Sequence, residues 1–114
     1  MSPAISWNGV FPAVTTQFRE DLSLDIDATA KVIDALVRDG VSGLIVCGTV
    51  GENTSLARAE KVQVMEAAVS VARGRVPVIC GIAEFTTAFA IETARAARQA
   101  KVDGIMVMPA LVYS

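Results

Sequence analysis

Short apolar runs alternate with segments of helical period along this chain, and that alternation constrains the fold more than any other feature. The apolar runs cover residues 9–15, 42–47, 76–80 and 104–108. Between them, apolar residues recur every three or four positions over residues 25–39, 58–73 and 87–100. Strands that alternate with helices are typical of a parallel sheet with right-handed crossovers. The sequence therefore predicts an α/β fold.

Capping residues mark the ends of the expected helices. Asp25 or Asp27 is suited to cap the first helix, and Gly40 is suited to end it in the left-handed region. Thr86 or Thr87 is suited to cap the third helix.

Two features of the expected strands leave alternatives open. Pro12 lies in the middle of the run 9–15 and lacks an N–H, so this strand is either short or starts late. Residues 41–46 resemble residues 102–107, which indicates either equal repeating βα units or a general likeness between helix–strand junctions.

The loop after the second apolar run is the candidate functional site. The run 43–47 is apolar, and it changes abruptly to Gly, Thr, Glu and Asn over residues 48–54. Loops at the carboxyl ends of parallel strands commonly bind small molecules, and Gly48 and Gly51 let the backbone bend there. Thr49 either directs its hydroxyl and amide at an anion or bonds its own turn. Glu52 is either an acid or base or a structural residue.

Composition argues against several other functions. The net charge of −2 and the pI near 5.0 do not suit a nucleic-acid partner, and no apolar run approaches the ~18 residues of a membrane span. The N-terminus has no secretory leader pattern, and the chain has no His for a Ser-His or Cys-His pair. Cys47 and Cys80 lie far apart in apolar runs, so we expect two buried free thiols, no metal and a cytoplasmic location.

Several motifs, taken in order, resemble the dihydrodipicolinate synthase / N-acetylneuraminate lyase family. They are residues 9–15, 38–44, 48–52 (Gly-Thr-Val-Gly-Glu), 76–81, 86–88 and 104–109. This resemblance implies a (β/α)8 TIM barrel of about 250 residues or more. Residues 1–114 are then the N-terminal half of one barrel domain and supply about its first four strands and three helices.

The same resemblance implies the chemistry. The family's members are Schiff-base (class I) aldolases, lyases or synthases that act on pyruvate or a related 2-oxo acid without a cofactor. By resemblance, Gly48, Thr49 and Val50 bind the substrate carboxylate, Thr49 joins a catalytic proton relay, and Glu52 ties the loop amides together. The imine-forming lysine and the main tyrosine come from later strands in the family, so we expect this chain alone to be inactive.

Two positions depart from the family pattern. Synthases usually carry Thr where this chain has Val50, which favours a relative with a different aldehyde partner. Tyr113 matches the family tyrosine that reaches a neighbouring subunit only if the loop is two residues longer than usual. The expected partners are a pyruvate-like 2-oxo acid and further copies of the chain in a dimer or tetramer, with no nucleic acid and no membrane.

A different class of function remains as an alternative. The chain is then a non-catalytic α/β half-barrel, or a small-molecule-binding module that self-associates, because a four-stranded parallel sheet leaves two open edges. The sequence stops soon after the exit of its last apolar run, which favours a piece of a larger barrel over a complete module.

Overall fold

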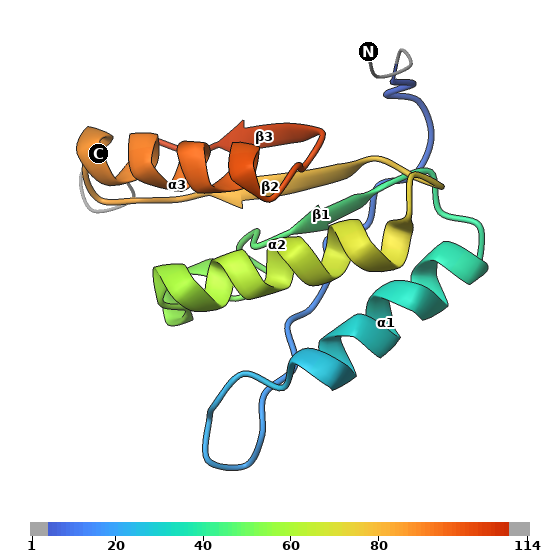
Figure 1. Cartoon of the computed structure of the whole chain (residues 1–114), viewed down its shortest axis with the longest axis horizontal. Helices are drawn as coiled ribbons and strands as arrows, with labels where there is room; N and C mark the ends of the chain where they lie inside the picture. The colour runs from blue at the N-terminus through green and yellow to red at the C-terminus, as the bar shows by residue number, and fades with distance from the viewer. Residues whose placement is uncertain (1–4, 110–114) are drawn as a thin grey trace.

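A computed structural model describes residues 5–109 as helices that alternate with parallel strands (Figure 1). In chain order the main elements are α1 (Ile26–Arg38), β1 (Leu44–Val46), α2 (Arg58–Ala72), β2 (Val78–Ile82), α3 (Thr87–Gln99) and β3 (Gly104–Val107). A three-residue 3-10 helix, η1 (Asn53–Ser55), precedes α2. The strands form one sheet in the order β1-β2-β3, with both pairs parallel.

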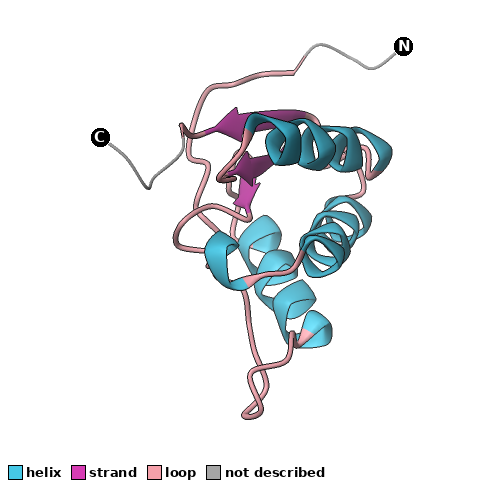
Figure 2. Cartoon of the chain, turned by 90° about the vertical axis from the view of Figure 1, so that its left-hand side faces the viewer, coloured by secondary structure: helices cyan, strands magenta, loops and turns pink. Residues whose placement is uncertain are grey.

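The helices lie on one side of the sheet, as Figure 2 shows. Alternate strand residues point to this side and are fully buried, among them Leu44, Val46 and Val78. Ile45 and Ile79 alternate with them and are only half-buried. The core therefore forms between the sheet and one helical layer. Its helix residues include Ile33, Val64, Met65, Ala68 and Ala97.

The helix ends follow the sequence. Asp25, rather than Asp27, caps α1, and its carboxylate accepts a hydrogen bond of 3.0 Å from the Ala28 N–H. Thr86, rather than Thr87, caps α3 through a 3.0 Å bond from the Phe89 N–H. Gly40 follows α1 with a φ of +93°, which confirms the expected left-handed ending.

The expected first strand at residues 9–15 is short, as Pro12 indicated. It is reduced to a single parallel bridge, Ala13 to Ile45, with bonds of 3.0 Å to the Pro12 carbonyl and 2.8 Å from the Val14 amide. Pro12 cannot donate, and the Val10 N–H bonds to the Ser42 hydroxyl instead of a strand carbonyl. The segment still runs beside β1 and forms one border of the sheet.

The other strands shift by a few residues from the expected ranges. β1 starts at Leu44 and not at residue 42, because the Ser42 amide bonds to the Val10 carbonyl. β2 starts after Pro77 and continues through Gly81 and Ile82, which pair with β3. On α3, the apolar side chain of Ile91 is 47% exposed.

Candidate functional site

The site loop leaves β1 through a tight backbone path. Cys47 adopts a φ of +57°, which is uncommon for a residue with a side chain. A turn then closes with the Glu52 N–H donating to the Thr49 carbonyl at 3.0 Å. The Asn53 N–H donates to the Gly48 carbonyl at 3.2 Å, so the loop folds back on its own start.

The glycines of the site have a different role from the one expected. The positive φ angles fall at Cys47 and Glu52 and not at Gly48 or Gly51. Gly51 is instead needed for close packing, because an added Cβ would lie 2.8 Å from the Val14 carbonyl oxygen. The Gly51 carbonyl in turn accepts a 2.6 Å bond from the buried Thr16 hydroxyl. The loop is thereby held against the N-terminal segment.

Thr49 and Val50 form the exposed tip of this loop. Among the residues that the structure describes, none accepts a hydrogen bond from either amide. The Thr49 hydroxyl lies 3.8 Å from the Met108 sulfur, a weak acceptor at the exit of β3. Gly48 beside them is buried. The loop thus presents two unused N–H donors and a hydroxyl near the carboxyl ends of β1 and β3.

Asn53, and not Glu52, ties the loop to the sheet. The Glu52 side chain is exposed, and its carboxylate accepts no hydrogen bond from any described residue. The Asn53 side chain is 1% exposed and donates to the carbonyls of Cys47 at 2.8 Å and Gly81 at 3.3 Å. One amide therefore connects the exits of β1 and β2.

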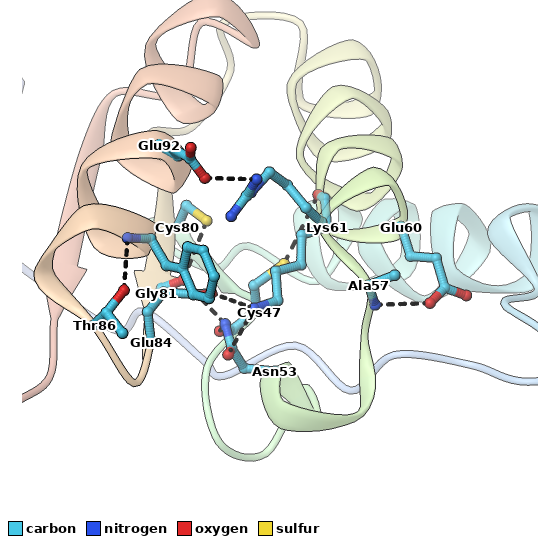
Figure 3. A network of polar contacts seen from close by, with 12 residues as sticks. Cys47, Asn53, Ala57, Glu60, Lys61, Cys80, Gly81, Glu84, Thr86 and Glu92 are labelled. Carbon is cyan, nitrogen blue, oxygen red and sulfur yellow. Dashed lines mark hydrogen bonds and ion pairs between the residues drawn. The ribbon is translucent and has the colours of Figure 1, made fainter. Parts of the chain in front are cut away.

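Lys61 extends this network into the core (Figure 3). Its Nζ lies 3.1 Å from Asn53 Oδ1 and 2.6 Å from Glu84 Oε1. The side chains of Lys61 and Glu84 are only 7% and 12% exposed. A buried charge is tolerated when it is paired and hydrogen-bonded, and both conditions hold here.

The sequence pattern did not predict this network, because Asn53, Lys61 and Glu84 lie in three segments that meet only in the folded chain. A signal was present, because Lys61 lies three, four and seven positions before Val64, Met65 and Ala68 on the apolar face of α2. A lysine at such a position requires a buried partner.

A cavity of about 270 Å³ adjoins the network. Arg58 crosses it from α2 to α3, with a 2.8 Å ion pair to Glu92 and its guanidinium 5.6 Å from the Phe89 ring centroid. The lining is mixed in polarity and comprises Asn53, Thr54, Leu56, Arg58, Lys61, Ala83, Glu84, Phe85 and Phe89.

Both cysteines are buried and free, as the sequence predicted. Cys47 follows β1, and Cys80 lies in the middle of β2, where it pairs in register with Val46. The neighbouring Cys80 thiol, together with burial, raises the pKa of Cys47 above its ordinary value. Cys47 is therefore a packing residue beside the loop and not a nucleophile at neutral pH.

Other kinds of site find no support within residues 5–109. This part of the chain contains no cluster of three or more His, Cys, Asp or Glu side chains arranged to hold a metal ion. Its helices also include none with the length and apolar character needed to cross a membrane. Tyr113 lies outside the described residues.

Comparison with known proteins identifies the family. A family model described as the dihydrodipicolinate synthetase family matches residues 6–113. The chain belongs to this family. Among curated members it is 43% identical over 102 residues to the 4-hydroxy-tetrahydrodipicolinate synthase of Sorangium cellulosum, and 39% identical over 109 residues to an uncharacterized DapA-like lyase of Rhizobium meliloti. These matches cover 89% and 96% of the chain.

Solved structures of the family have the same arrangement of elements. YagE from Escherichia coli K12, solved in complex with pyruvate, matches 95% of the chain with a TM-score of 0.88 and 34% identity. N-acetylneuraminate lyase from Mycoplasma synoviae matches 93% with a TM-score of 0.87 and 30% identity. The chain is thus a lyase-family α/β structure with the topology of part of a TIM barrel. It spans only 34% to 37% of the length of these four relatives.

Proposed function

We propose that this chain forms the carboxylate-binding part of a Schiff-base aldolase, lyase or synthase that acts on pyruvate or a related 2-oxo acid. One observation carries the proposal: Thr49 and Val50 are exposed together beyond the carboxyl end of β1, and their amides have no acceptor among the described residues. Preorganised N–H groups of this kind stabilise negatively charged oxygens. The pyruvate bound to the family member YagE supports a 2-oxo acid as the ligand.

Thr49 has a second role in the proposal. Its hydroxyl lies on the same exposed tip as the two amides, and its neighbour is the thioether of Met108 at 3.8 Å. A thioether is a poor acceptor, so the hydroxyl remains available to donate to a substrate or to pass on a proton. Thr49 therefore orients the carboxylate and takes part in the proton relay. Gly48 completes the turn beneath it.

The imine-forming lysine is not supplied by this chain in the proposal. Its three lysines are Lys31, Lys61 and Lys101. Lys31 lies on the exposed surface of α1, and Lys61 is held in a buried ion pair. Lys101 lies between α3 and β3, before the strand and not at its carboxyl end. None is placed to attack a carbonyl carbon bound at Thr49, so we propose that residues 1–114 alone do not turn over substrate.

The second substrate and the assembly are also proposals. Val50 keeps the amide but removes the hydroxyl that synthases of the family usually have, which favours an aldehyde partner other than that of dihydrodipicolinate synthesis. The active protein is a cytoplasmic homo-oligomer, a dimer or tetramer, without a cofactor. The proposal on the second substrate and the proposal on the assembly both rest on the family membership of the chain.

Borohydride trapping tests the proposed function. The protein is purified from its native source, incubated with pyruvate, reduced, and measured as an intact mass. We expect a chain heavier than 12.0 kDa that carries one reduced pyruvate adduct, with no adduct on the 114-residue chain alone. A protein without any adduct would contradict Schiff-base chemistry. An adduct on the isolated chain would contradict the assignment of its lysines.

A self-associating, non-catalytic module is the second candidate. It is favoured by β3, where Ile105, Met106 and Val107 are 42% to 58% exposed on a strand that pairs only with β2 among the described strands. Exposed apolar strand edges promote association. A native protein of 12.0 kDa that forms no adduct but sediments as a defined oligomer would support this candidate.

A further inference from the structure

We infer that Lys61 is a positioning residue for the carboxylate-binding loop, acting through Asn53. This inference deepens the proposed function and rests on it. Among the described residues, the Lys61 ammonium hydrogen-bonds to Asn53 and Glu84 and not to Thr49 or Val50. Its link to the loop is the amide of Asn53, at 3.1 Å from Oδ1.

Lys61 fixes the orientation of the Asn53 side-chain amide. An asparagine amide can lie in either of two orientations that differ by a flip. The Lys61 ammonium is a donor only, so it fixes Oδ1 toward α2. Nδ2 is thereby directed at the carbonyls of Cys47 and Gly81, at 2.8 and 3.3 Å. In the opposite orientation, the Asn53 Nδ2 donor would face the Lys61 ammonium. Asn53 Oδ1 would then face the carbonyl oxygens of Cys47 and Gly81.

The oriented Asn53 amide in turn holds the backbone of Cys47. Its carbonyl is the last one before the loop, and its φ of +57° is a strained value for a residue with a side chain. The Asn53 amide binds this carbonyl, and Gly81 leaves the space for it, because a Cβ there would lie 2.6 Å from the Cys47 oxygen. Thr49 and Val50 follow Cys47 by two and three residues. The backbone geometry at Cys47 therefore sets the direction in which their amides project.

Glu84 holds Lys61 in position. Its carboxylate holds the Lys61 ammonium at 2.6 Å and belongs to the loop that leaves β2. Lys61 thus joins three segments, namely α2, η1 and the β2 exit (Figure 3). A lysine that served only to fill the core would be replaced well by an apolar residue, whereas an orienting lysine would not.

A double variant separates these roles in the 114-residue chain. Lys61→Met with Glu84→Leu removes both charges and keeps side chains of similar size, so that no buried charge is left unpaired and the fold is preserved. The control is Lys31→Met, which removes a lysine from the exposed surface of α1. Circular dichroism and urea unfolding establish that the variants fold before any other measurement is made.

Amide hydrogen exchange is the first readout and needs no ligand. The Glu52 and Asn53 N–H groups close the loop through bonds of 3.0 and 3.2 Å. We expect both to exchange at least about tenfold faster in the folded double variant, and to remain unchanged in Lys31→Met. Unchanged exchange in a folded double variant would overturn the inference.

Pyruvate binding, followed by amide chemical shifts, is the second readout. We expect the double variant to bind pyruvate at least about tenfold more weakly than the unaltered chain, and Lys31→Met to bind it equally. Equal binding by the double variant would also overturn the inference. Faster exchange in the double variant, combined with no pyruvate binding by the unaltered chain, would leave the positioning role intact and reject the proposed function.

Discussion

Gly81 and Gly48 differ in how closely other backbone atoms approach them. A Cβ at Gly81 would lie 2.6 Å from the Cys47 oxygen and 3.0 Å from its carbonyl carbon, and neither atom can move without disturbing the loop. At Gly48 the nearest atom would be the Ile45 Cγ2, at 3.8 Å. The requirement for glycine is therefore strict at the exit of β2 and weak at the exit of β1.

Substitution by alanine tests this difference. We expect Gly81→Ala to lower the free energy of unfolding by about 1–3 kcal/mol, because overpacking forces backbone shifts. The matched Gly48→Ala should change it by less than about 1 kcal/mol, since neither a clash nor a positive φ opposes it. Urea unfolding of both variants measures the difference. Equal losses of stability would contradict the close approach at Gly81.

Thr93 on α3 has a buried hydroxyl for which the described residues provide no partner. An unsatisfied polar group in the core costs free energy, and valine has nearly the same shape without the hydroxyl. We expect Thr93→Val to raise the free energy of unfolding by about 0.5–1.5 kcal/mol. Thermal unfolding monitored by circular dichroism measures it. A lower midpoint for the variant would show that the hydroxyl has a partner in solution.

At the residue scale, the sequence predicted the exposed tip of the site but not what holds it in place. The position of Thr49 and Val50 followed from the change from an apolar run to polar residues. The contacts of Asn53, Lys61 and Glu84 depend on three segments that meet only after folding. Local pattern indicates where a chain turns, whereas a long-range polar network requires the tertiary arrangement.

At the scale of the elements, the start of α3 is determined by a capping side chain and by the backbone N–H group that this side chain satisfies. α3 begins where the Thr86 hydroxyl accepts the Phe89 N–H at 3.0 Å, and Thr87 is already helical. Removing an N-cap side chain leaves a helix donor unsatisfied. The two adjacent threonines therefore offer a matched pair of substitutions at one helix end.

We expect Thr86→Ala to lower the free energy of unfolding by about 1 kcal/mol and Thr87→Ala to change it by only a few tenths. Alanine is a good helix former, so at residue 87 it costs little. Urea unfolding monitored by far-UV circular dichroism distinguishes the two variants. A larger loss for Thr87→Ala would place the cap one residue later than the structure does.

Helix extents were predicted more accurately than strand extents. The expected ranges 25–39, 58–73 and 87–100 differ from the helices by one residue or less at each end. The backbone hydrogen bonds of a helix join residues four positions apart, so the local sequence determines where a helix begins and ends. Strand limits depend on partners, and residues 9–15 form only one bridge because Pro12 and the Ser42 hydroxyl interrupt the ladder.

At the scale of the whole molecule, the main feature is the side of β3 that pairs with no other described strand. The strand carries Ile105, Met106 and Val107, all substantially exposed, and Val50 at the loop tip is 57% exposed. Leu22 is 80% exposed but lies alone in the turn before α1. A contiguous apolar edge drives association, whereas a single exposed side chain does not.

Sedimentation of the 114-residue chain tests the role of this edge. We expect the unaltered chain to associate, and Val107→Lys to shift the distribution toward the monomer, because a charge on an edge strand blocks pairing. Leu22→Lys adds the same charge away from the edge and should leave association unchanged. A monomeric unaltered chain, or equal effects of the two lysines, would contradict this role for β3.

The fold class and family were predictable from the sequence because the alternation of strands and helices and the order of the motifs are local properties of the chain. The number of strands was not predictable from the sequence, because an extended segment becomes a strand only when it pairs with another segment. The chain matches about a third of the length of its relatives, and the described sheet has the same topology as the corresponding part of their barrels. The chemistry we propose is therefore that of a whole barrel to which this chain contributes one binding loop.

The most direct test of the central claim is a titration of the isotopically labelled chain with pyruvate, followed by amide chemical shifts. Pyruvamide, which has the same shape but no negative charge, is the matched control. We expect pyruvate to shift the Thr49 and Val50 amide signals in a saturable way, and pyruvamide to leave them in place. Unmoved Thr49 and Val50 signals, or equal shifts with pyruvamide, would contradict the claim that these amides bind a carboxylate.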